Sequence, residues 1–173
     1  LSKLPELDFG ISISCPDGTL LESDLNHWKN VNGDQIGEIN MGQAFKLQKA
    51  GYDYVAGNIS YETLAQLNNE NHGADWLPYV WIPEPDVQKD KKLNFSGLPY
   101  FEKVTQPILV VQGLADEVIP IQSYKTIEHT LKKSQSTHYE VITLENTSHA
   151  MMLLDNDFPY FQILHPAYIA TLK

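Results

Sequence analysis

Three short segments of the chain have the apolar pattern that is typical of buried β-strands. The middle one is a continuous run of aliphatic residues, with a proline before it and a glycine after it. A strand that is covered on both faces of a sheet has this pattern, because neither of its faces meets water. We therefore predict strands at Asp8–Ser14, Ile108–Gln112 and Tyr139–Leu144.

Apolar residues at helical spacing follow two of these strands. The spacing from Ile121 to Leu131 predicts a helix that ends in two lysines, where cations suit the negative end of the helix dipole. A second helical pattern covers Phe158–Leu172, and Pro166 within it predicts a kink or a restart. Strands that alternate with helices in this way predict a parallel sheet with right-handed crossovers.

The region between the first two strands has a different character. It is rich in proline and predicts two short helices, Glu38–Ala50 and Tyr61–Asn71, the second with Ser60 as its N-cap. An insertion of this length is unusual for a plain crossover and suggests a helical cap over the sheet edge. The predicted fold is therefore α/β, with a parallel sheet of about three strands, flanking helices and a mainly helical cap. Its segments are a core strand at 1–15, the cap at 16–100 and the C-terminal core at 101–173.

The charge of the chain narrows the classes of partner. Its 173 residues include 12 basic and 22 acidic side chains, for a net charge of −10. Such a surface repels phosphate and anionic lipid, which argues against nucleic-acid and membrane binding. No apolar run reaches the roughly 18 residues that a membrane-spanning helix needs. The single cysteine, Cys15, cannot form an internal disulfide, and this fits a reducing, cytoplasmic location.

An acid and a histidine follow two neighbouring strands of the predicted sheet. Asp116 lies in the turn after the strand at Ile108–Gln112, and His149 lies in the turn after the strand at Tyr139–Leu144. Adjacent strands are about 4.8 Å apart, so the two side chains can meet at the carboxyl edge of the sheet. A carboxylate there fixes the imidazole tautomer and leaves the other ring nitrogen free to act as a base. The alternative is that Asp116 caps the helix that follows it.

The stretch from Gln106 to about Lys173 resembles the C-terminal end of an α/β-hydrolase, with the acid after one core strand and the histidine after the next. The resemblance implies that Asp116 is the acid and His149 the base of a Ser-His-Asp triad. It also implies an esterase or aminopeptidase-like hydrolase without a cofactor or a metal, acting on a small ester or amide. The residue before the histidine is often glycine in this family, and here it is Ser148.

The family's nucleophile motif, G-x-S-x-G, does not occur in the sequence. The nearest segment, Gly10–Ser14, lacks the closing glycine and lies inside a predicted strand, so Ser12 and Ser14 are poor nucleophile candidates. Cys15 fits a buried small hydrophobe better than a reactive thiol. We therefore expect the serine to lie outside this sequence and the chain alone to be inactive. The expected partner is the missing N-terminal half of the fold, or a dimer mate along the exposed strand edge.

Three questions remain open from the residues themselves. Trp76 and Trp81 lie in a proline-interrupted loop of the cap and are predicted to bind substrate in an apolar pocket, although the same rings could simply fasten the cap to the core. The acid and the histidine could also be structural residues of a non-catalytic α/β binding or interaction module. A third hypothesis is an enzyme that uses Cys15 as its nucleophile.

Overall fold

A computed structural model of the chain describes residues 6–134, 136, 138–154 and 163–172. The chain divides into two compact units. One consists of residues 1–18 together with residues 96–173 and contains the parallel sheet. The other, Thr19–Phe95, is helical.

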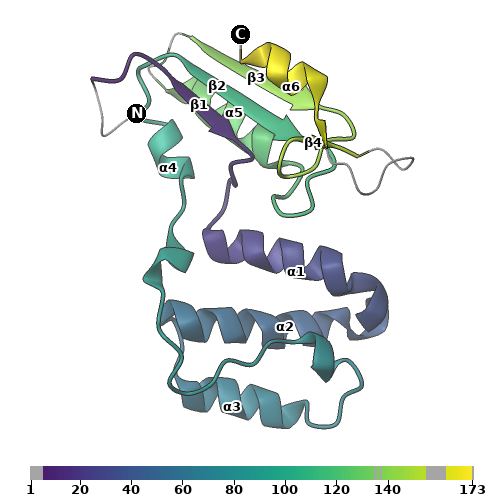
Figure 1. The fold of residues 1–173 in the computed structure, drawn as a ribbon. Coiled ribbons are helices and arrows are strands. Elements are labelled where there is room, and N and C mark those ends of the chain that lie inside the picture. Colours follow the sequence, from purple (N-terminus) through teal and green to yellow (C-terminus); the bar gives the residue numbers. More distant parts are fainter. Residues whose placement is uncertain (1–5, 135, 137, 155–162, 173) are drawn as a thin grey trace. The chain divides into compact units, whose positions relative to one another are not determined.

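The sheet unit contains the three predicted strands in the order β1-β2-β3 (Figure 1). Both pairs are parallel, with Gly10 opposite Ile108 and Ile108 opposite Tyr139. The predicted parallel α/β arrangement is thus confirmed. The strands are β1 at Gly10–Ile13, β2 at Ile108–Gly113 and β3 at Tyr139–Leu144.

Side chains of β2 alternate between two apolar clusters, as the pleat of a strand requires. Ile108 and Val110 pack with residues of α5 (Ser123–Lys133), which lies behind the sheet in Figure 1. Val111 belongs to a second cluster, against which residues of α6 (Pro166–Thr171) pack. A strand buried on both faces explains the continuous aliphatic run in the sequence. A short helix, α4 (Leu98–Phe101), precedes β2 and packs near α5.

The helical unit has its own apolar core. Helix α2 packs against both α1 and α3, and two short 3₁₀ helices contact α1 or α2 (Figure 1). The core includes Leu47, Leu64 and Trp76, all buried. No helix within the described residues is both long and apolar enough to cross a membrane. The elements are α1 at Leu20–Ile36, α2 at Glu38–Ala56, α3 at Tyr61–Glu70, η1 at Leu77–Tyr79 and η2 at Lys91–Asn94.

Helix α1 was not predicted from the sequence. Its asparagines and its glycine lower the intrinsic helix propensity, so tertiary packing of Leu21, Leu25 and Trp28 stabilises it. A local signal does exist. The Thr19 hydroxyl accepts a hydrogen bond from the Glu22 backbone N–H, and the Glu22 carboxylate accepts one from the Thr19 N–H. This capping box is an N-terminal helix signature that can be read from the sequence.

The C-terminal helix prediction is wrong in part. Strand β5 (Ile163–Leu164), within the predicted helix, pairs antiparallel with β4 (Met152–Leu153). Pro166 starts helix α6 at its first position, where a proline leaves no helical hydrogen bond unmade. Residues 158–162 of the prediction lie outside the described part of the chain. The prediction failed because the helical spacing of apolar residues does not reveal that this segment pairs with a strand about ten residues before it.

Candidate active site

Asp116 lies just beyond the carboxyl end of β2, and its side chain is fully buried. Its Oδ1 accepts hydrogen bonds from the backbone N–H groups of Val118 (2.9 Å) and Ile119 (2.8 Å). Asp116 therefore orders its own turn. It does not cap the next helix, because α5 begins only at Ser123 and has Gln122 as its N-cap residue. The turn holds the carboxylate in place at the rim of the sheet.

Gln112 provides the other oxygen of this carboxylate with a donor. Its Nε2 lies 2.9 Å from Asp116 Oδ2 and 3.2 Å from the carbonyl oxygen of Gly113. This residue was not predicted from the sequence. The available signal was a single amide side chain at the end of an otherwise aliphatic strand, where an unpaired polar group is unfavourable.

His149 lies in the loop after β3, and its ring meets the carboxylate. Nδ1 is 3.1 Å from both Oδ1 and Oδ2 of Asp116. With a proton on Nδ1 donated to the carboxylate, Nε2 has a free lone pair and can accept a proton. The side chain is 38% exposed, so a reactant can approach the ring from outside. The structure thus brings together the two residues that the sequence predicted as acid and base.

The loop that carries His149 packs directly against the end of β2. The backbone N–H of Ala115 donates to the carbonyl of Thr147 at 3.0 Å. A Cβ atom on Gly113 would lie only 2.3 Å from that same carbonyl oxygen and 2.7 Å from the carbonyl of Ser148. This close approach explains the glycine after the strand, because any larger residue would displace the loop.

Ser14 connects the end of β1 to the same loop. Its hydroxyl donates to the main-chain carbonyl of His149 at 2.9 Å, and its backbone has a positive φ of 46°. The side chain of Ser14 is thus engaged in holding the loop. Cys15 follows it, and burial raises the pKa of the thiol above its usual range. A thiol of this kind is largely protonated at neutral pH and is a weak nucleophile.

Trp76 and Trp81 both belong to the helical unit. Trp76 is buried in its core. Trp81 is 46% exposed, its ring lies 5.9 Å from that of Tyr52, and its backbone N–H donates to Gln48 Oε1. Their predicted role in substrate binding stays a prediction.

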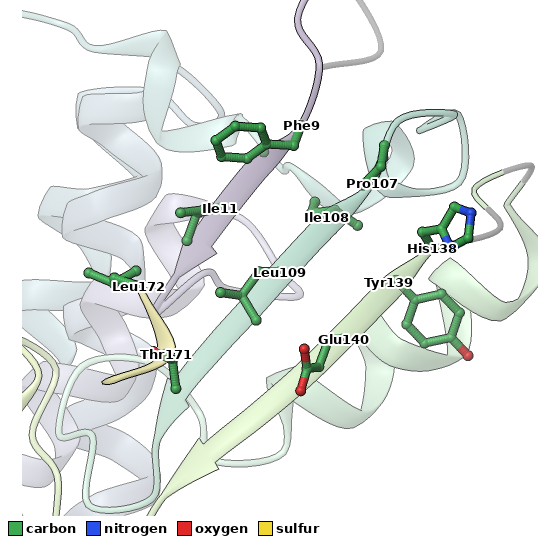
Figure 2. A pocket seen from close by; sticks show the side chains of 11 residues that line it. Phe9, Ile11, Pro107, Ile108, Leu109, His138, Tyr139, Glu140, Thr171 and Leu172 are labelled. Atoms are coloured by element: carbon green, nitrogen blue, oxygen red, sulfur yellow. The ribbon is translucent and has the colours of Figure 1, made fainter. Parts of the chain in front are cut away.

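A cavity of about 540 Å³ opens on one face of the sheet, at the amino ends of the strands (Figure 2). Asp116 and His149 follow the carboxyl ends of β2 and β3, so the cavity and the acid–histidine pair lie at opposite ends of the sheet. The cavity is therefore not the place where this pair would act. Its lining includes Phe9, Ile11, Pro107, Leu109, His138 and Leu172.

Comparison with known proteins gave a partial similarity to a solved structure. No family model matches the chain, and no curated protein matches it. Among solved structures, the chain is similar to the acylaminoacyl peptidase of Pyrococcus horikoshii in its orthorhombic crystal form, with a TM-score of 0.41 and 17% sequence identity. The similarity covers 86% of this chain and 17% of that one. The chain thus spans about a sixth of the length of the matched peptidase.

Proposed function

We propose that the chain is the C-terminal part of a serine hydrolase of the α/β-hydrolase type, which transfers acyl groups from carboxylic esters or amides to water. The observation that supports this most directly is the contact of Asp116 with His149 Nδ1 at 3.1 Å. Both residues follow the carboxyl ends of adjacent parallel strands, which is where open α/β sheets bind their ligands.

In the proposed reaction His149 is the general base and then the general acid. Its Nε2 takes the proton of a serine hydroxyl from outside this sequence while the serine oxygen bonds to the substrate carbonyl carbon. The same proton then goes to the leaving alcohol or amine as its bond to that carbon breaks, and an acyl-enzyme remains. Water then attacks the acyl-enzyme through the same two proton transfers, and the carboxylic acid is released from the serine. Asp116 keeps the imidazole oriented and stabilises the imidazolium.

Within the described residues, β1 pairs with a strand on one side only, and this suggests how the nucleophile is supplied. The N–H groups of Gly10 and Ser14 donate to β2, so those of Ile11 and Ile13 face away from it, because this direction alternates along a strand. The side chains of Ile11 and Ile13 are 44% and 41% exposed. An apolar edge of this kind favours pairing with a further strand. We take that strand to belong to the nucleophile-bearing half of the fold, with a second copy of the chain as the alternative.

Hydrolysis of a p-nitrophenyl ester by the protein that includes the nucleophile-bearing half tests the proposal. We expect His149→Ala and Asp116→Asn each to lower kcat by about 10⁴-fold or more. The control is His129→Ala, which removes an exposed histidine from α5 and is expected to leave the rate unchanged. Equal rates for the wild type and His149→Ala would contradict the proposal and favour a non-catalytic module.

A further inference from the structure

Gln112 is a polar residue at a buried position of β2, a strand whose other buried side chains are apolar. It is 1% exposed and follows Val110 and Val111, two fully buried side chains of the same strand. A primary amide is buried there at a cost in free energy unless its donors and acceptor find partners. The Asp116 carboxylate is such a partner, because it accepts a hydrogen bond from the Gln112 amide at 2.9 Å. An aliphatic residue at this position could not donate that hydrogen bond. The role of Gln112 is therefore tied to Asp116.

The donors to the Asp116 carboxylate are divided between its two oxygens. Oδ1 accepts two backbone N–H groups of the turn, and Oδ2 accepts Nε2 of Gln112. Because the carboxylate is fully buried, water cannot replace a lost donor. With both oxygens held, the plane of the carboxylate cannot rotate about the Cβ–Cγ bond, and it stays directed at His149 Nδ1.

We propose that Gln112 is a positioning residue that fixes the plane of the Asp116 carboxylate and, through it, the Nδ1–H tautomer of His149. This inference rests on the proposed function, which needs an unprotonated Nε2. A neutral amide suits the task, because it orients the carboxylate without neutralising it. The full negative charge then remains available to stabilise the imidazolium.

Nitrogen-15 NMR of the histidine rings in the 173-residue chain tests the proposal without requiring activity. At a pH where the ring of His149 is neutral, its two ¹⁵N shifts report the tautomer. We expect mainly Nδ1–H in the wild type. In Gln112→Met, which keeps the volume but removes the donor, we expect the ratio of Nδ1–H to Nε2–H to fall by about two- to tenfold, the effect of losing one hydrogen bond.

The helical unit offers a matched control. Gln48 is also a fully buried glutamine, and its Oε1 accepts the backbone N–H of Trp81. Gln48→Met removes a buried amide of the same size from a different core, so we expect it to leave the His149 tautomer ratio unchanged. An equal change in both variants would indicate a general loss of stability and overturn the proposal.

A measurement on the wild type keeps the test valid even where Gln112→Met does not fold. A scalar coupling across the hydrogen bond, from the Gln112 side-chain ¹⁵N to the Asp116 carboxyl ¹³C, is expected, and its absence would overturn the proposal. The two hypotheses fail differently. A wild-type His149 that is mainly Nε2–H would contradict the proposed function. If His149 is mainly Nδ1–H in the wild type and a folded Gln112→Met has the same tautomer ratio, only the proposed role of Gln112 is contradicted.

Discussion

At the scale of single residues, the packing at the rim of the sheet depends on the lack of a side chain at one position and on a polar side chain at the position before it. Gly113 has no Cβ, and this lets the carbonyls of Thr147 and Ser148 approach the end of β2. Gln112, next to it, reaches Asp116 with its amide. Two neighbouring positions thus set the approach of the His149 loop and the orientation of the carboxylate.

We predict that Gly113→Ala destabilises the fold by about 1–3 kcal/mol, the usual effect of overpacking a close contact. Its Cβ would lie 2.3 Å from the Thr147 carbonyl oxygen, so the loop must move and the contact between His149 and Asp116 is expected to lengthen. Urea unfolding measures the change in free energy. Gly97→Ala is the control, since its Cβ would meet no atom closer than 3.8 Å. Equal stabilities of the two variants would contradict the prediction.

The thiol of Cys15 gives a prediction with a defined pH dependence. Burial raises its pKa, so at any given pH the folded protein has less thiolate than the unfolded chain. We expect alkylation by iodoacetamide to be slower in the native protein than in urea, with its pH profile displaced to higher pH. The stability that depends on this thiol is fully present at pH values below the pKa of Cys15 in the unfolded chain. It is lost as the pH rises through the pKa of Cys15 in the folded protein. A native rate equal to the unfolded rate would contradict this account.

At the scale of elements, helix α2 contains two glycines in opposite surroundings. Gly42 is exposed, and a Cβ there would meet nothing within 4 Å. Gly51 is buried, and a Cβ there would lie 2.8 Å from the carbonyl oxygen of Trp81. One glycine only weakens the helix, and the other is required by the segment packed on it.

We therefore predict changes of opposite sign for the same substitution in one helix. Gly42→Ala should stabilise the protein by about 0.5–1 kcal/mol, because alanine has the higher helix propensity. Gly51→Ala should destabilise it, because the Trp81 backbone must shift. Thermal unfolding followed by circular dichroism measures both, and each variant is the control for the other. A shift of the same sign in both would contradict the prediction.

Strands and helices were predictable to different extents, for physical reasons. Strand β2 was predictable because both of its faces are covered, so its apolar run is continuous. The N-cap of α3 was predictable because Ser60 accepts the Thr63 N–H within the same turn. Strand β5 was not, since two residues form a strand only by pairing with Met152 and Leu153.

At the scale of the whole molecule, the chain leaves the sheet unit after Gly18 and re-enters it at Ser96. The two ends of the helical unit meet, because the backbone N–H of Leu20 donates to the Phe95 carbonyl at 3.0 Å. A segment with its own core and adjacent ends has the properties of an inserted domain.

We predict that residues 19–95 fold on their own. Their core, which includes Leu47, Leu64 and Trp76, consists of residues of the segment itself, so the isolated segment keeps all the members of that core. The isolated segment should show a helical circular dichroism spectrum and a cooperative thermal transition. The control is the same segment with Leu47→Asp, which places a charge in the core and should abolish the transition. A non-cooperative melt of the unmodified segment would contradict the prediction.

The sequence by itself determined the parallel strands, the helix between β2 and β3, and the placement of Asp116 and His149 after adjacent strands. These features follow from local periodicity and from the rule that parallel strands end at one edge of the sheet. Only the tertiary structure decided that Gln112 and the turn amides hold the carboxylate and that Ser14 holds the His149 loop. The Ser14 contact joins residues 135 positions apart, so it depends on how whole elements pack. The contacts of Asp116 with Gln112 and the turn amides lie within four residues along the chain, but they depend on the path of the turn, which apolar periodicity does not give.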